Sequence, residues 1–189
     1  MKALEQASFP AIAERAGALY DEEQDALLLA MLGQEYIIRR DGILLRGQKA
    51  PDGHASVILD YLFSSGSALT LMPWRTIGDF PGARCADFRK SVELPVAQHA
   101  AEVITRAQSI LPMFDGAAVP SLIGSDMAIT MRALPMVYLH AELSQETQDF
   151  PSEAWILFSN NAHEFLSAES LQALGETFKD RLLGLIRIY

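Results

Sequence analysis

A tyrosine, a histidine and a glutamate occur at alternate positions of one short apolar segment. Tyr138, His140 and Glu142 alternate there with valine, leucine and alanine, which is the period of a β-strand with one polar face. Side chains two residues apart on a strand stand in a row, so His140 can share a proton with Glu142 or with Tyr138. The spacing indicates a candidate acid–base site, and the alternative is the ordinary half-exposed face of an outer strand.

A second candidate is the irregular stretch PWRTIGDFPGA, residues 73–83. Trp74 is large enough to stack on a planar ligand or to anchor a core, and Arg75 can pair with an anion. The prolines restrict the backbone, so we expect an ordered loop. It is either a ligand-binding loop or a rigid strap over the core, and Arg75 faces either a pocket or a carboxylate such as Asp79 or Asp126.

Two further polar residues are candidates for ligand binding. Asp126 follows Gly124–Ser125, where an aspartate commonly accepts hydrogen bonds from its own turn. His163 stands beside Glu164 on a short helical turn, and neighbouring residues on a helix do not share a face. We therefore expect turn or surface roles for both, with ligand binding as the alternative.

The residue types of the chain give little indication of a metal or cofactor site. Cys85 is the single cysteine, so it forms neither an intramolecular disulfide nor a thiolate cluster. We predict no metal site and no cofactor. A metal site would require the fold to gather His140, His163, Asp126 and Glu142.

The composition limits the partners and the location of the protein. The 189 residues carry a net charge of −9, which disfavours nucleic acid as a partner. The most apolar run, Ala26–Leu32, is far shorter than the roughly 20 residues that cross a bilayer. Glu5 and Glu14 interrupt the region where a signal peptide would be apolar. We expect a cytoplasmic protein without membrane contact, with a small molecule or a protein as its partner.

Hydrophobic periodicity predicts an α+β fold, with a mostly antiparallel sheet, an N-terminal hairpin and helices packed on one side. The hairpin is expected to turn at Asp41–Gly42. We expect one compact domain, residues 1–189, with a helical and hairpin part at about 1–115 and a strand and helix part at about 116–189. The predicted helices are 10–19, 21–33, 54–66, 94–114 and a last helix after Ser167. The predicted strands are 127–132, 136–143 and 154–158.

Several segments in order resemble a known family: YDEEQDALLLAMLGQEYII, ILDYLFSSG, PWRTIGDFPGA, GSDMAITMRALPMVYLHAE and DFPSEAWILFSNNAHEFLSAESLQAL. Together they are similar to the uncharacterised domain-of-unknown-function family numbered 3786, from about Ala16 to Leu185. The resemblance implies an origin in anaerobic bacteria or archaea and an association with iron–sulfur and corrinoid proteins. Many relatives carry a cysteine-rich domain that holds an iron–sulfur cluster, and Cys85 alone is not enough to hold such a cluster. The positions that the resemblance marks for testing are Trp74, Phe80, Pro81, Gly82, Asp126 and His163.

These observations favour a non-catalytic accessory or small-ligand-binding domain. Its candidate ligand-binding residues are Trp74, Arg75, Asp126 and His163, and the resemblance implies a link to anaerobic C1 or corrinoid metabolism. One alternative is an enzyme with an unfamiliar site around Tyr138, His140 and Glu142. A second is a structural or protein-interaction module. The sequence leaves the substrate and the oligomeric state open.

Overall fold

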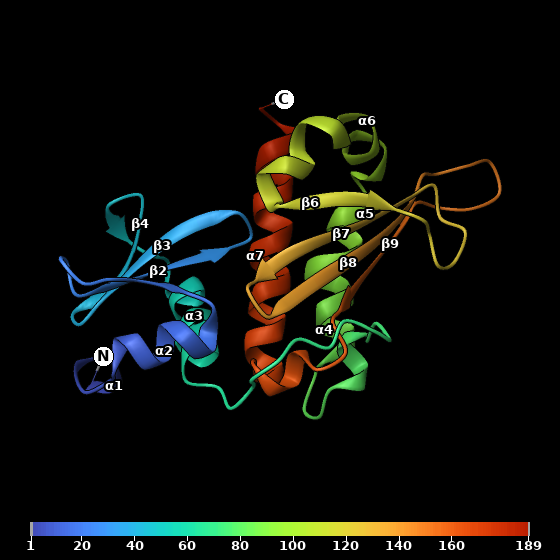
Figure 1. Cartoon of the computed structure of the whole chain (residues 1–189). Coiled ribbons are helices and arrows are strands. Elements are labelled where there is room, and N and C mark those ends of the chain that lie inside the picture. The colour runs from blue at the N-terminus through green and yellow to red at the C-terminus, as the bar shows by residue number, and fades with distance from the viewer. Residues whose placement is uncertain (1, 189) are drawn as a thin grey trace.

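The N-terminal part of the chain forms a five-stranded antiparallel meander, in the order β1-β2-β3-β4-β5. The structure is a computed structural model that describes residues 2–188. The short helices α1 and α2 precede this sheet, and α3 follows it and packs near its edge (Figure 1). The bounds are α1 Lys2–Glu5, α2 Phe9–Ala16, β1 Leu19–Asp21, β2 Ala26–Met31, β3 Gln34–Arg39, β4 Gly42–Leu45, β5 Gln48–Lys49 and α3 Asp52–Leu62.

The helix predicted over residues 21–33 is wrong, because this segment forms a turn and strand β2. A short apolar run fits a buried strand as well as a buried helix, and alternation decides in favour of the strand. Leu27, Leu29 and Met31 are buried in the core. Asp21 does accept backbone amides as a helix cap would, from Glu23 at 3.0 Å and from the next residue at 3.1 Å, but it closes a β-turn.

The predicted hairpin is present, with its turn one residue earlier than expected. Arg39 pairs with Gly42, so Arg40 and Asp41 make the connection. Positive φ angles occur in the two flanking turns. They are 52° and 70° at Leu32–Gly33, and 52° and 76° at Arg46–Gly47.

The C-terminal part contains a four-stranded antiparallel sheet in the order β6-β7-β8-β9. The alternation predicted for β8 is confirmed on its inner face, where Leu139, Ala141 and Leu143 are buried. The outer face was expected to be half-exposed, but His140 and Glu142 are buried there too. Strand β6 was not predicted. The bounds are β6 Gly116–Val119, β7 Met127–Leu134, β8 Val137–Ser144 and β9 Glu153–Phe158.

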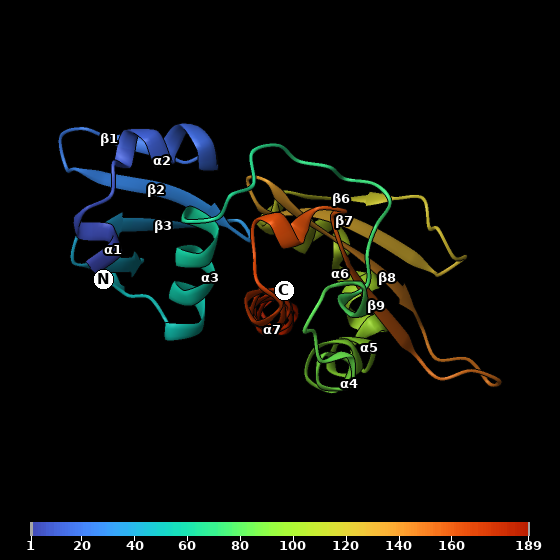
Figure 2. The same cartoon turned by 90° about the horizontal axis from the view of Figure 1, so that it is seen from below.

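Helices cover the inner face of the C-terminal sheet, and the last helix also lies against the N-terminal half (Figures 1 and 2). The helix predicted over residues 94–114 is divided into α5 and α6, and a 3-10 turn that contains Pro112 follows α6. Ser167 caps the last helix by accepting from the amide of Ser170 at 3.3 Å. The bounds are α4 Cys85–Phe88, a π-helical turn Arg89–Glu93, α5 Leu94–Ala97, α6 Ala100–Ile110, a 3-10 turn Leu111–Phe114 and α7 Ala168–Ile186.

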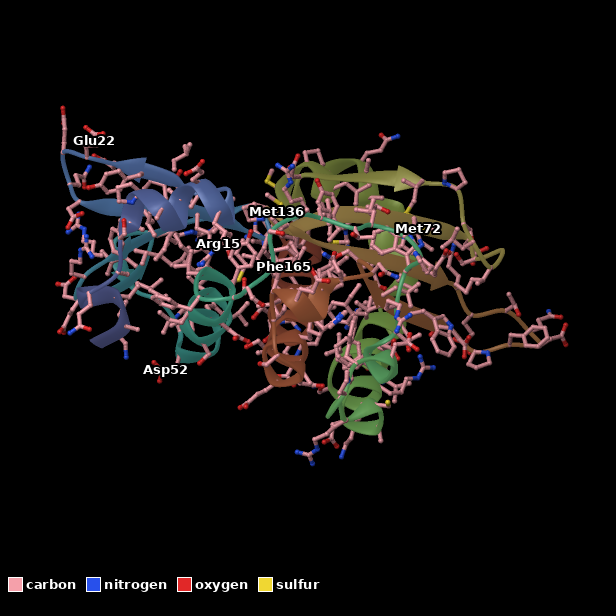
Figure 3. The ribbon with its side chains drawn as sticks, turned by 60° about the horizontal axis from the view of Figure 1, so that its bottom comes forward. Arg15, Glu22, Asp52, Met72, Met136 and Phe165 are labelled. Atoms are coloured by element: carbon pink, nitrogen blue, oxygen red, sulfur yellow. The ribbon has the colours of Figure 1, made fainter. Side chains whose placement is uncertain are left out.

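The two sheets are joined directly as well as through α7. The amide of Leu32 donates to the carbonyl of Ala133 at 2.8 Å. The hydroxyl of Tyr61 donates to Ala16 at 2.7 Å and accepts from the amide of Met136 at 3.2 Å. Met136 lies at this junction in Figure 3. The α+β class is confirmed, with the strands divided between two antiparallel sheets.

Between residues 2 and 188, no helix is both long enough and apolar enough to cross a membrane.

Candidate functional site

An extended segment, residues 67–76, crosses the outer face of the C-terminal sheet, on the side away from α7 (Figure 2). We call this segment the strap; Met72, labelled in Figure 3, belongs to it. Arg75 and Phe158 exchange both backbone hydrogen bonds, at 2.9 and 2.8 Å. The side chain of Asn161 accepts from the amide of Thr70 at 2.8 Å. These contacts fix the strap to the end of β9.

The strap places Trp74 over the polar row of β8. The indole of Trp74 stacks on the imidazole of His140, with ring centroids 5.0 Å apart and planes at 24°. His140 is only 1% exposed, whereas Trp74 is half-buried. One face of the indole therefore covers the imidazole, while part of the side chain remains open to solvent.

Glu142 is held as a buried carboxylate beneath the strap. It is 1% exposed and takes hydrogen bonds from His140 Nε2 at 2.9 Å and from the amide of Leu122 at 2.7 Å. The hydroxyl groups of Ser121, at 2.7 Å, and Ser125 also donate to it. Burial raises the pKa of Glu142, but these hydrogen bonds outweigh it and lower the pKa to about 2. The carboxylate is therefore ionised at neutral pH.

The ionised carboxylate determines the tautomer of His140. A carboxylate only accepts hydrogen bonds, so the proton of the neutral imidazole lies on Nε2. Nδ1 is then an acceptor, and Thr130 Oγ1 lies 3.0 Å from it. With the imidazole in this neutral tautomer, the hydroxyl, imidazole and carboxylate form a continuous chain, in which Thr130 donates to His140 and His140 donates to Glu142. Thr130 is the half-exposed end of this chain.

This arrangement can move a proton or orient a ligand. The imidazole is placed to accept the proton of Thr130, which is the geometry of general-base activation of a hydroxyl. In the same tautomer, the hydroxyl of Thr130 uses its proton toward His140, and its oxygen can still accept a hydrogen bond from another group. A group bound there would meet an acceptor beside an aromatic ring.

Tyr138 and Asp126 lie outside this cluster. The hydroxyl of Tyr138 accepts from Arg132 Nε at 2.9 Å, so it pairs with β7 and not with His140. Asp126 is exposed and accepts from the amide of Gln145 at 2.7 Å. It lines a separate hollow of about 390 Å³ that also contains Phe150.

The other residues of the irregular stretch serve its packing. Phe80 is buried, and its ring lies 5.7 Å from the imidazole of the exposed His163. The guanidinium of Arg75 lies near Asp79, with Nε 4.0 Å from the carboxylate. Of the two aspartates that the sequence suggested as partners of Arg75, Asp79 is therefore the one that it approaches. Trp74 stacks on His140 at the start of this stretch, whereas His163, in a turn after β9, contacts Phe80 near its end, so the two side chains do not form one site.

Of the four residues considered as metal ligands, the structure brings His140 and Glu142 together but places Asp126 and His163 elsewhere. No three His, Cys, Asp or Glu side chains of the described part of the chain are arranged to hold a metal ion. Cys85 is a free, exposed thiol.

Sequence reasoning missed three members of the cluster: Thr130, Ser121 and Ser125. Thr130 pairs directly with His140 only because a β-bulge between Arg132 and Leu134 shifts the register of β7 against β8, and the length of the connection does not reveal that shift. Ser121 and Ser125 lie on a loop whose path toward Glu142 no periodicity describes. Ser121 also organises that loop, accepting from the amides of Gly124 and Ser125 at 2.8 Å each.

Comparisons with known proteins give one match. No curated protein and no solved structure matches the chain. A family model described as "Domain of unknown function (DUF3786)" matches residues 8–181. That span includes the strap, all the strands and most of α7. The chain therefore belongs to the DUF3786 family.

Proposed function

We propose that this domain binds a small planar ligand on the outer face of the C-terminal sheet, against Trp74 of the strap and Thr130 of β7. The observation that carries the proposal is the stack of Trp74 on His140, since it joins an accessible aromatic ring to an oriented polar chain. Such sites combine an apolar surface with a few placed polar groups.

The energetics of the polar chain support a role beyond packing. Burying a carboxylate and an imidazole costs free energy, which their hydrogen bonds must offset. A strand face that only supported a strap would be served as well by apolar side chains. Here four donors, two of them hydroxyl groups of loop residues, form hydrogen bonds to Glu142 alone. Their common effect is to fix the tautomer of His140 and the direction of the Thr130 hydroxyl.

The proposal specifies the ligand chemistry. Thr130 offers lone pairs, so the ligand presents a hydrogen-bond donor to it. The ligand also has a flat ring that stacks on the exposed part of Trp74. Aromatic nitrogen heterocycles with an N–H group meet both requirements. The accessory role in anaerobic C1 or corrinoid metabolism, implied by the family resemblance, is part of the proposal and makes benzimidazole a natural first probe.

A fluorescence titration tests the proposal. Trp155→Phe leaves Trp74 as the reporter, since the chain has two tryptophans. Adenine and benzimidazole should then change the emission saturably, while cyclohexylamine, which has a donor but no flat ring, should not. Thr130→Val should weaken the binding about tenfold, the loss of one hydrogen bond to a buried ligand group. Thr105→Val, at an exposed threonine of α6, is the control.

Two results would contradict the binding proposal: emission that responds linearly to every probe, or a Thr130→Val variant that binds as well as its control. The titration measures binding through fluorescence emission, so it works whether or not the protein catalyses a reaction.

The unbroken chain from Thr130 to Glu142 favours an enzyme as the second candidate. In that case His140 removes the proton of Thr130, and the hydroxyl acts as a nucleophile. A fluorophosphonate reagent should then modify Thr130, and mass spectrometry of the digested protein would locate the adduct. The adduct should be lost in His140→Gln. Absence of modification at Thr130 in the unsubstituted protein would leave binding as the function.

A further inference from the structure

Two arginines that are far apart in the sequence, Arg46 and Arg181, contact the uncharged side chain of Gln34. Arg46 belongs to the turn between β4 and β5, and Arg181 to the last helix, α7. With its oxygen turned toward them, the amide of Gln34 accepts from Arg46 Nη2 at 3.3 Å and from Arg181 Nη1 at 3.2 Å. Two positive groups therefore converge on a single uncharged acceptor.

Neither guanidinium has a carboxylate partner within ion-pair distance among residues 2–188. The acid nearest in sequence, Asp180, pairs with Lys179 at 2.7 Å. Arg181 is instead held by neutral groups: it donates to the carbonyl of Met113 at 2.8 Å and lies 5.2 Å from the ring centre of Phe114. Its Nε is buried and has no hydrogen-bond acceptor within the described chain.

The two arginines border two adjoining hollows at the junction of the two halves. One has a volume of about 250 Å³ and is also lined by His54 and Asp180. The other, of about 360 Å³, is lined by the glycines of the two neighbouring turns, Gly33 and Gly47. The walls thus come from the N-terminal sheet, from α3 and from α7, and ligand sites are frequent at such junctions.

The back of the first hollow is polar and uncharged at neutral pH. Burial lowers the pKa of His54, so its imidazole is neutral. The hydroxyl of Tyr36 lies 2.8 Å from His54 Nδ1, and burial raises the pKa of Tyr36 to about 12. Burial, with a contribution from Arg46, lowers the pKa of Arg181. The positive charge of the lining comes from the two arginines, and its negative charge from Glu35 and from Asp180, which pairs with Lys179.

Like charges held close together are unfavourable unless an anion lies between them. The chain has a net charge of −9 and many carboxylates, so two arginines that have no carboxylate partner among residues 2–188 stand out. The planar fork of a guanidinium matches the oxygens of a carboxylate or phosphate with two parallel hydrogen bonds. The size of the hollows admits a small molecule that carries such a group.

We propose that Arg46, Arg181 and Gln34 form a binding site for the oxyanion group of a small molecule, separate from the site under the strap. The bound anion accepts hydrogen bonds from both guanidinium groups. These charge-assisted bonds replace the weaker hydrogen bonds that the arginines donate to the uncharged amide of Gln34. Because the arginines come from different halves of the fold, its binding also tightens the junction between the N-terminal sheet and α7.

The experiment is a titration with inorganic phosphate, and separately with acetate, at ionic strength held constant with potassium chloride. Amide resonances of Gln34, Gly47 and Arg181 should shift saturably, and the unfolding temperature should rise. Phosphate and acetate together separate a phosphate-type ligand from a carboxylate-type ligand. Arg46→Asn is the main variant, since asparagine tolerates the φ of 52° at this position. It should weaken binding at least tenfold.

The variant also distinguishes binding from a structural role. If the site exists for an anion, Arg46→Asn removes repulsion and leaves the unfolding temperature without phosphate unchanged or higher. If Arg46 serves the fold through Gln34, the same variant lowers it. Lys90→Gln removes one charge from an exposed lysine that lines neither hollow, and should leave phosphate binding unchanged. Equal shifts with phosphate and chloride, or equal binding by Arg46→Asn, would overturn the proposal.

Discussion

Trp74 and His140 are stacked across the boundary between an irregular segment and a regular sheet, with ring centroids 5.0 Å apart. The contact connects residues that are far apart in the sequence. It shows that the strap contributes directly to the polar cluster of β7 and β8. The residues at the start of PWRTIGDFPGA cover this cluster, and Phe80 near its end is buried in the core.

Replacing Trp74 should weaken the fold by a measurable amount. Trp74→Leu removes the stacking on His140 and exposes the imidazole, and an aromatic pair contributes about 1 kcal/mol beyond its burial. We expect the free energy of unfolding to fall by about 1–2 kcal/mol in urea denaturation. Trp155→Leu is the matched control, because Trp155 is 39% exposed on β9. A larger effect at Trp155 than at Trp74 would refute the importance of the stack.

Glu142 should make the stability of the protein depend on pH in acid. Its pKa is about 2 in the folded protein, below the ordinary value of 4.5, so the unfolded chain binds the proton more tightly. The carboxylate therefore contributes stability that is complete above about pH 4.5 and is lost as the pH falls toward 2. The shift corresponds to about 3 kcal/mol.

Glu142→Gln tests this linkage by urea denaturation between pH 7 and pH 2. The variant should be less stable than the unsubstituted protein at pH 7, and the difference should shrink as the pH falls below 4.5. Glu146→Gln removes a charge from an exposed loop and is the control. A difference that stays constant over this pH range would argue against an ionised, hydrogen-bonded Glu142.

Gly33 and Gly47 allow two effects of glycine to be separated. Both have positive φ, 70° and 76°, but a Cβ at Gly33 would lie 2.0 Å from the carbonyl oxygen of Met113, whereas nothing lies within 4 Å of one at Gly47. Gly47→Ala should cost about 1 kcal/mol, from backbone strain alone. Gly33→Ala adds overpacking and should cost about 3 kcal/mol or more in the same denaturation assay. Equal costs would mean that the turn at Gly33 moves freely away from Met113.

The sequence predicted best the elements whose apolar pattern continues over many residues and whose ends carry a recognisable capping residue. The last helix presents its apolar stripe over five turns and begins at a capping serine, so local chemistry suffices to define it. The segment Ala26–Leu32 failed because a run of leucines satisfies helix and strand alike. Its strand identity depends on the partner β3, which supplies the hydrogen bonds, and on the positive φ at Leu32 and Gly33.

The candidate site divides in the same way. Strand alternation by itself determined that Tyr138, His140 and Glu142 share a face, because side chains on a strand repeat every two residues. Only the tertiary structure decided that His140 pairs with Glu142, that Tyr138 belongs to Arg132, and that Trp74 and two serines complete the cluster. The convergence of Arg46 and Arg181 on Gln34 was likewise invisible. The physical reason is that these contacts join segments whose separation along the chain carries no periodic signal, and they exist only after the strap, the sheets and α7 have packed together.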